Sequence, residues 1–390
     1  MGSRRVTRWG LAGMAAVLVL AGCSTGSTGD TSSSGTTDQA AGSDVSAEVK
    51  ANVEKYKALP TFTPPGEAID PSSLKGKSMF LIPLVPNPFN QNIQDTMKSI
   101  ADKVGMKFTL YPNQGKASEW VQGMNAAVTA KPDIIVLSTA PDPRVLQPQL
   151  EAAKKAGIPV LVTHFYDDAS ENPPACDGCA AGVTALVTAP FNVAGKAAAD
   201  WIIQDSNGKG NVLVIGAADI LPSPATVKVV TTELSEACPG CKSTVINIPV
   251  ADWNTKVQGE VQAALNKDPN INYVYPLYDA MVAGAVPAVQ TVGKAGKVKV
   301  VSYNGSPYAL KFIQDGNIVA MNVGEDTVGI AYASMDQAFR ILLGKPTVDQ
   351  RTPIRIWDDT NVADAGTPPE VGKGYGTALS SGYSKLWGMG

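Results

Sequence analysis

The sequence predicts an α/β fold made of two lobes, and three observations lead to this prediction. The chain has 390 residues, of which 44% are apolar and 17% are charged, so it is long enough to bury more than one hydrophobic core. Short apolar runs alternate with helical patterns, which is typical of βαβ units with parallel sheets. The same alternation then occurs a second time. Two such halves indicate two lobes with a cleft between them, where small molecules commonly bind.

The first half starts at about residue 77. Its helical segments carry apolar stripes, and two of them stop at Gly105 and Gly157, as helix C-termini commonly do. The strands expected in this half are 79–85, 107–111, 134–138 and 159–165. The second set of expected strands is 183–188, 211–216, 243–250, 273–277, 298–303 and 318–323.

Two tryptophan-bearing segments are expected to serve packing. Trp120 shares a helical stripe with apolar residues and is interpreted as part of a packed helix face rather than of a cofactor site. The tail 383–388 (YSKLWG) contains Leu386 and Trp387, which need cover from water. We expect this tail to pack on the second lobe.

Residues 1–22 are interpreted as an export signal peptide. They combine a basic start (Arg4, Arg5 and Arg8) with an apolar run at 11–20 that is too short to span a bilayer permanently. The general secretory path is favoured, because the residues around Arg4 and Arg5 fit the twin-arginine motif poorly. Removing three arginines and no acid changes the formal net charge from −3 to about −6. Nucleic acid is therefore not expected as a partner.

A lipid anchor is expected directly after the signal peptide. Residues 20–23 (LAGC) resemble the bacterial lipobox, in which cleavage before the cysteine allows Cys23 to be lipidated. Residues 23–45 form a tract rich in Ser, Gly and Thr that is expected to be a disordered tether, followed by an N-terminal helix and connector at 46–75. Several acyl chains bind a membrane firmly. The protein is thus expected to be extracytoplasmic and anchored to the cell membrane.

Several short motifs follow one another in a recognisable order. They are Asn87-Pro88-Phe89, 153–159 (AKKAGIP), 195–202 (GKAAADWI), 251–253 (ADW), 278–284 (YDAMVAG) and 301–305 (VSYNG). With these motifs, the chain from about residue 77 to 345 resembles the sugar-binding family of bacterial periplasmic solute receptors, typified by ribose-binding protein. Soluble transcriptional regulators share this fold, but here the leader stands where their DNA-binding head would be.

The resemblance implies two Rossmann-like lobes of the type I periplasmic binding protein fold, joined by a three-crossing hinge. The expected lobes are 76–188 with 324–350, and 189–323 with 351–390. The crossings are expected near Ala189, Val323 and Arg351. The family implies a monomer without enzymatic activity, cofactor or metal, which closes on a small-molecule ligand and presents it to an ABC permease.

The resemblance also assigns the ligand-binding positions. Amide and aromatic side chains follow the first strand, and further polar and aromatic residues follow later strands of both lobes. The expected ligand-binding residues are Asn87, Phe89, Asn90, His164, Phe165, Trp253, Tyr278, Asp279 and Asn304.

Several of these residues depart from the family pattern. His164 and Phe165 stand where the family has a carboxylate and an arginine, and Asn304 replaces a carboxylate. The family's glutamine falls at about Val323. A buried charge without a partner is unfavourable, so a pocket that has lost charged groups suits a ligand that does not pair with them. We therefore expect a ligand less hydroxylated than free ribose, such as a substituted sugar, a polyol or a ring compound.

His164 is the chain's single histidine, so a histidine-based catalytic relay is possible only there and a multi-histidine metal site is excluded. A strand-end histidine that makes one hydrogen bond is the plain alternative. Because His164 matches a contact position of the family, we expect it to line the cleft. If it contacts the ligand, its protonation is expected to weaken binding.

Four further cysteines form two CxxC pairs, Cys176 with Cys179 and Cys238 with Cys241. CxxC pairs occur in zinc ribbons and in redox sites, but the gap between these two pairs is much longer than the roughly 15–20 residues of a ribbon. Export favours disulfides. Two local disulfides are expected, with zinc binding or a redox role as the alternatives.

Two classes of function follow from these observations. The favoured one is a substrate-binding lipoprotein of an ABC importer, and a receptor that signals through a membrane partner would use the same closure. The alternative is an exported redox or hydrolytic lipoprotein that uses the CxxC pairs, or His164 with Asp279.

Overall fold

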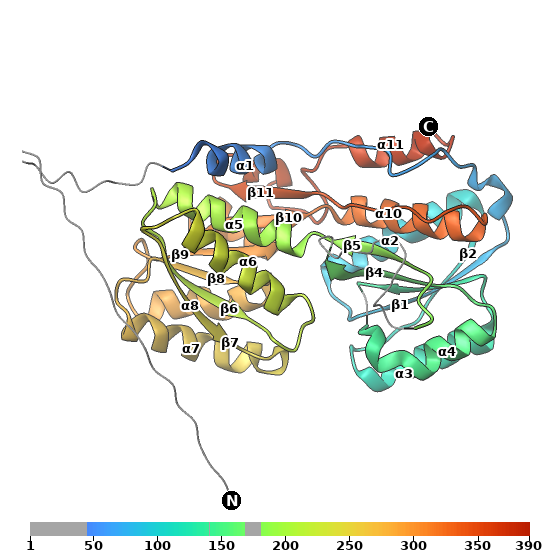
Figure 1. Ribbon diagram of the computed structural model, residues 1–390, viewed down its shortest axis with the longest axis horizontal. Coiled ribbons are helices and arrows are strands. Elements are labelled where there is room, and N and C mark those ends of the chain that lie inside the picture. Colours follow the sequence, from blue (N-terminus) through green and yellow to red (C-terminus); the bar gives the residue numbers. More distant parts are fainter. Residues whose placement is uncertain (1–44, 140, 168–180) are drawn as a thin grey trace, which may run out of the picture. The chain divides into compact units, whose positions relative to one another are not determined.

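The computed structural model describes residues 45–139, 141–167 and 181–390, and the fold is the predicted two-lobed α/β architecture (Figure 1). One sheet has five parallel strands in the order β2-β1-β3-β4-β5, and the other has six in the order β11-β10-β9-β8-β6-β7. Every strand of the second sheet is parallel to its neighbours except β11, which runs antiparallel to β10. Among the described residues, no helix has both the length and the apolar character needed to cross a membrane.

The first sheet forms the core of the N-terminal lobe, and the four strands predicted for this half are confirmed. The run 183–188, predicted as the first strand of the second set, is instead the last strand of this sheet. Its strands are β1 (Ser78–Pro83), β2 (Lys107–Leu110), β3 (Ile134–Ser138), β4 (Val160–Asp167) and β5 (Ala185–Ala189). Its helices are α2 (Pro88–Val104), α3 (Ala117–Ala130), α4 (Gln147–Lys155) and α10 (Thr327–Leu342). α3 and α4 cover one face of the sheet, and α2 and α10 cover the other (Figure 1).

Alternate residues of β1 enter the cores on the two faces of this sheet. Met79 and Leu81 pack with α2 and α10, whereas Phe80 and Ile82 pack with α3 and α4. Because both faces are covered, the strand has no polar side, which explains why it is a continuous apolar run in the sequence.

The second sheet forms the core of the C-terminal lobe. Its strands are β6 (Asn211–Gly216), β7 (Lys242–Asn247), β8 (Tyr273–Pro276), β9 (Lys299–Asn304), β10 (Val319–Glu325) and β11 (Ile354–Asp358). Its helices are α5 (Phe191–Asp205), α6 (Ser223–Glu236), α7 (Trp253–Lys267), α8 (Val282–Thr291) and α9 (Pro307–Gln314). All of these strands except β11 were predicted.

The chain passes between the lobes where elements of one lobe follow strands of the other. It leaves the first sheet after β5 and enters α5, which packs in the second core. It returns between β10 and α10, since α10 packs in the first core, and leaves again in the segment before β11.

Both ends of the described chain contact both lobes. Val49 and Val53 of α1 (Ala47–Lys57) pack in the second core, whereas Ile69 and Leu74 of the following segment pack in the first. At the other end, Tyr375 packs in the second core, and α11 (Ala378–Leu386) lies beside α10 in the first (Figure 1).

The expectation that the tail packs on the second lobe is therefore wrong for Leu386 and Trp387. The Trp387 ring stacks on Tyr332 with centroids 5.5 Å apart and meets Phe339 edge-on at 5.0 Å. Its Nε1 donates a hydrogen bond of 2.8 Å to Asp336 Oδ1. These three partners all lie on α10, which offers this indole both an aromatic surface and a buried acceptor.

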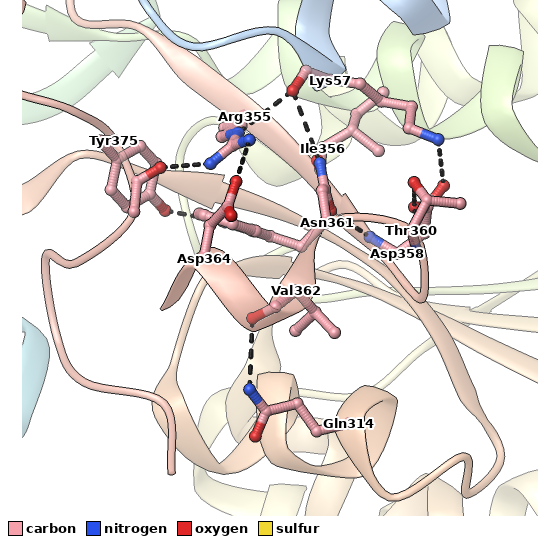
Figure 2. A network of polar contacts seen from close by, with 12 residues as sticks. Lys57, Gln314, Arg355, Ile356, Asp358, Thr360, Asn361, Val362, Asp364 and Tyr375 are labelled. Atoms are coloured by element: carbon pink, nitrogen blue, oxygen red, sulfur yellow. Dashed lines mark hydrogen bonds and ion pairs between the residues drawn. The ribbon is translucent and has the colours of Figure 1, made fainter. Parts of the chain in front are cut away.

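A polar network joins β11 to the end of α1 and to the segment that follows β11 (Figure 2). The buried Arg355 guanidinium donates to the main-chain oxygen of Lys57 at 3.1 Å and pairs with Asp364 at 2.7 Å. The Lys57 ammonium forms an ion pair of 2.9 Å with Asp358 at the end of β11. This strand is thus fixed by charged side chains as well as by its pairing with β10.

Candidate functional site

A cavity of about 680 Å³ is formed by segments from both lobes. In the N-terminal lobe, the lining lies at or after the carboxyl ends of β1, β2, β3, β4 and β5, and in the C-terminal lobe it lies at or after those of β6, β7, β8, β9 and β10. Val371 and Gly372 of the tail also line it. The carboxyl ends of parallel strands are the usual ligand site of open α/β sheets, so this cavity is the candidate site.

Most of the ligand-binding residues predicted from the sequence meet at this cavity. Those among its lining are Asn87, Phe89, Asn90, His164, Phe165, Tyr278, Asp279 and Asn304. Trp253 is not part of the lining. Its ring stacks on that of Tyr278 with centroids 5.7 Å apart, and its Nε1 donates to the main-chain oxygen of Ile248 at 2.9 Å. In this structure Trp253 supports a lining ring from behind.

The turn after β1 is shaped by its own amides. Asn87 Oδ1 accepts a 2.8 Å hydrogen bond from the main-chain nitrogen of Asn90 and so caps α2, with Pro88 in the first turn of the helix. The Asn90 side-chain nitrogen donates to the main-chain oxygen of Val85 at 2.7 Å. These two amides therefore fix the backbone that presents Phe89 to the cavity.

Trp120 was expected only as a packed helix face, but it also lines the cavity. The ring is half-buried against the core on the α3 side of the first sheet, and its Nε1 donates to the main-chain oxygen of Leu84 at 2.9 Å. No sequence motif marked this role, because helix periodicity shows which stripe is apolar and not where that stripe ends at a cleft.

His164 lies next to a carboxylate that the sequence did not indicate. Its Nε2 is 2.9 Å from both Oε1 and Oε2 of Glu325. The side chain of Glu325 is fully buried, and that of His164 is 9% exposed. The imidazole also lies 5.4 Å from the ring of Phe89 and 5.3 Å from that of Phe191. His164 thus lines the cavity as predicted and is held by an acid at the end of β10.

Among the described residues, the Tyr303 hydroxyl is buried beside Glu325 and is the second donor group near this carboxylate, after His164. Burial raises the pKa of Tyr303 well above its usual value, and the negative charge of Glu325 contributes in the same direction. Glu325, two residues after the position matched to the family's glutamine, therefore places a carboxylate directly against the histidine.

Asp279 has a different environment, because its carboxylate is surrounded by donors. Oδ1 accepts from Ser302 Oγ at 2.7 Å and from Asn322 Nδ2 at 2.6 Å, and Oδ2 accepts from the main-chain nitrogen of Ser306 at 2.7 Å. Burial raises its pKa to about 6, although these donors act in the opposite direction. Asp279 organises the turn at 304–306, in which Asn304 has a φ of +124°.

The two residues of the hydrolytic alternative are not paired with each other. His164 contacts Glu325, and Asp279 is bonded to Ser302, Asn322 and Ser306. Within the described part of the chain, no group of three or more His, Cys, Asp or Glu residues is arranged to hold a metal ion.

The cavity is negatively charged and aromatic. Its lining includes the carboxylates of Asp142, Asp219, Asp279 and Glu325, and among the described residues it includes no lysine or arginine. The sequence comparison with the family had suggested a loss of charged groups, but Glu325 was not considered there. Glu325 follows the predicted strand 318–323, whose carboxyl end was expected at the cleft, and this position could have identified it from the sequence.

The predicted cysteine sites fall partly outside the described residues. Cys23, Cys176 and Cys179 are not described. Cys238 and Cys241 are joined by a disulfide with Cα atoms 5.3 Å apart, at the junction between α6 and β7 and away from the cavity.

Comparisons with known proteins agree with the fold. A family model described as a periplasmic binding protein domain matches residues 79–346. The ribose import binding protein RbsB of Salmonella typhimurium strain LT2 is 23% identical over 241 residues, which are 62% of this chain and 76% of that protein. The fructose import binding protein FruE of Bifidobacterium longum is 28% identical over 236 residues, covering 58% of this chain and 67% of that protein.

Solved structures show the same architecture. An ABC transporter solute-binding protein from Bacillus halodurans with bound myo-inositol superposes with a TM-score of 0.64 at 19% identity, covering 75% of this chain and 98% of that chain. A second one, from Agrobacterium vitis with bound allitol, has a TM-score of 0.63 at 20% identity, covering 75% and 99%. These similarities show the type I periplasmic binding protein fold.

Proposed function

Because the chain belongs to the periplasmic binding protein domain family, we propose that it is the substrate-binding lipoprotein of an ABC importer. It captures a carbohydrate-like small solute between its lobes and delivers it to a membrane permease. Cys23 anchors it to the outer face of the cell membrane, and residues 23–45 tether the lobes to that anchor.

The cavity lined by strand ends of both lobes is the observation that carries this proposal. A ligand stabilises a closed form only if it interacts better with that form than with the open one. Phe89 and His164 come from the first lobe, and Tyr278 and Asn304 come from the second. A solute that contacts both sets favours closure, which is the state a permease has to recognise.

The ligand class follows from the lining. Aromatic rings supply apolar faces, and amides, hydroxyls and carboxylates supply hydrogen-bonding groups, as expected for a ring with an apolar face and polar substituents. A substituted sugar, a polyol or a ring compound with fewer hydroxyls than ribose fits this lining. Relatives are named for ribose and fructose import, and neighbours were solved with allitol and myo-inositol, so sugars and polyols are the solute class in these proteins. These solutes carry at least as many hydroxyl groups as ribose, so the proposal of a less hydroxylated ligand rests on the lining of this cavity alone.

The alternative of an exported redox or hydrolytic lipoprotein has less support. The hydrolytic version needs His164 to act with Asp279, and these residues have separate partners. The redox version needs a reactive CxxC pair, and Cys238 and Cys241 lie away from the cavity.

A thermal-shift screen of sugars, polyols and aromatic acids with the purified protein tests the binding function. A ligand at about 100 times its Kd stabilises the folded form by about 3 kcal/mol, which is readily detected. Stabilisation by one or a few compounds is expected, without turnover of the compound. A shift with aldopentoses alone would contradict the expected ligand class, and measurable turnover or dithiol activity would favour the alternative.

Phe89→Ala separates ligand stacking from general stability. Loss of this lining ring should weaken the binding of the hit compound about tenfold. Leu110→Ala is the matched control, because Leu110 is exposed on the edge strand β2 and does not line the cavity. If Phe89→Ala and Leu110→Ala bind the compound with equal affinity, Phe89 does not contact the ligand.

The anchor and the disulfides have independent tests. Cells that incorporate labelled palmitate should label the protein, and Cys23→Ser should abolish the label.

Thiol titration of the denatured, lipidated protein should find no free thiol, because we propose local disulfides in both CxxC pairs. Four free thiols, or bound zinc, would contradict the disulfides.

A further inference from the structure

The charges around the cavity are one-sided. Four carboxylates line it, those of Asp142, Asp219, Asp279 and Glu325, and among the described lining residues no lysine or arginine balances them. His164 is the one basic side chain of the described lining, and its charge depends on protonation. The acids differ in how well the protein itself satisfies them, and this difference points to the ligand.

Three of the carboxylates have protein donors. Asp142 pairs with Arg144, whose Nη2 is 2.6 Å from Oδ2 and whose Nε donates to both oxygens. Asp219 Oδ2 accepts from the main-chain nitrogen of Val250 at 3.0 Å. Asp279 accepts three hydrogen bonds, as described above. These groups have little need of a charged partner from a ligand.

Glu325 differs because it is fully buried and has few donors for its two oxygens. Its fully buried carboxylate has His164 Nε2 as its neighbour, 2.9 Å from both oxygens. One imidazole nitrogen carries at most one hydrogen, whereas a carboxylate has about four acceptor positions. The adjacent Tyr303 hydroxyl can donate one further hydrogen, so acceptor positions of the carboxylate still stay open. A buried carboxylate with so few donors is unfavourable until a further donor arrives, and the cavity is the side on which one can arrive.

The rings beside this carboxylate also favour a positive charge. Phe89 and Phe191 flank His164, and both line the cavity. The face of an aromatic ring carries negative charge density and attracts cations. Anionic solutes such as sugar acids or sugar phosphates would meet these ring faces and the carboxylates with no fixed cation to receive them.

We propose that the ligand is a ring compound bearing an ammonium group, of the amino sugar or aminocyclitol class, and that Glu325 receives the ammonium. This inference rests on the proposed binding function and specifies its ligand. The ring of the ligand lies against the aromatic side chains, and the ammonium donates to the acceptor positions of the carboxylate that His164 and Tyr303 leave open. Glu325 is then the residue that determines specificity by charge.

A matched ligand panel tests the proposal with the wild-type protein. Sugars and inositols of several configurations are each compared as the neutral compound, its amino counterpart and its carboxylate counterpart, by thermal shift and calorimetry. For at least one configuration the amino member should bind about tenfold more tightly than its neutral counterpart, and carboxylate members should not bind. Neutral members that bind as tightly as, or more tightly than, all amino members would overturn the proposal and leave the binding function intact. If no member of the panel binds, both are overturned.

Glu325→Gln assigns the effect to this carboxylate. The variant keeps the size of the side chain and removes its charge, so affinity for the amino ligand should fall about 10- to 100-fold, while a neutral counterpart loses much less. Asp102→Asn is the matched control, because this exposed residue of α2 pairs with Lys98 away from the cavity. An amino preference that survives in Glu325→Gln would overturn the assignment, and the wild-type panel decides the ligand class even if this variant does not fold.

Discussion

Replacing Asp279 by Asn should make the unfolding stability of the protein less dependent on pH. The carboxylate is buried at the cavity and accepts hydrogen bonds from Ser302, Asn322 and Ser306. Two effects oppose each other here, because the donors favour the ionised form and burial favours the neutral one. Burial is the larger effect, since the pKa of Asp279 is raised from 3.8 to about 6.

The size and sign of the effect follow from this shift. A rise from 3.8 to about 6 corresponds to about 3 kcal/mol between the two protonation states. The folded protein binds the proton more tightly than the unfolded chain, so the contribution of Asp279 to stability is fully present below about pH 4 and is lost as the pH rises through about 6. Asn cannot ionise and therefore lacks this loss.

Urea unfolding of both proteins at several pH values between 4 and 7.5 measures the difference. The free energy of unfolding of Asp279→Asn minus that of the wild type should increase by about 3 kcal/mol from the acid to the neutral end. Other buried carboxylates titrate in both proteins and cancel in the difference. Asp102→Asn should stay within about 0.5 kcal/mol of the wild type throughout. A difference for Asp279→Asn that is flat, or that decreases with rising pH, would show that the three donors outweigh burial and would refute the reasoning.

Four further substitutions test the packing. Gly324→Ala should destabilise by about 1–3 kcal/mol, because the added Cβ would overlap the Tyr375 hydroxyl, whereas Gly259→Ala in α7 meets no neighbour and should stabilise by about 0.5–1 kcal/mol in the same urea assay. Trp387→Ala should lower the free energy of unfolding by about 3–5 kcal/mol, and a loss below about 1 kcal/mol would contradict its place in the first core. Cys238→Ser should cost no more than about 2 kcal/mol, since its disulfide closes a very short loop, and a larger loss measured under oxidising conditions would show a wider structural role.

The strands of both sheets could be predicted because most of them are covered on both faces. Such strands are continuous apolar runs, as in β3 and β6, and they stand out against the amphipathic helices between them. β11 (Ile354–Asp358) lacks this signal. It is short and contains the charged residues Arg355 and Asp358. Their burial depends on partners from other segments, because Lys57 pairs with Asp358 and Asp364 pairs with Arg355. Those partners are distant in sequence, so local pattern could not reveal the strand.

The lining of the cavity could be predicted only at positions where a motif after a strand matches a contact position of the family. Eight of the residues so identified meet there, but the family comparison placed no contact at Glu325. Trp253 was matched to a stacking position, whereas in the structure its indole supports Tyr278. Which of two adjacent aromatic residues faces a ligand depends on how the segments after β7 and β8 pack together, and sequence spacing does not contain that information.

The segments outside residues 79–346 change how the hinge has to be understood. The predicted three-crossing hinge counts only the connections after β5, after β10 and before β11. Here the segment after α1 and the segment before α11 each have one end in the second core and the other in the first. The ring of Phe62 meets that of Tyr383 with centroids 4.8 Å apart, so the two segments contact each other where they reach the first lobe. Any movement of the lobes must therefore bend these two connections together with the three of the family. Val371 and Gly372, which precede the second connection, also line the cavity, so one of these connections begins next to its wall.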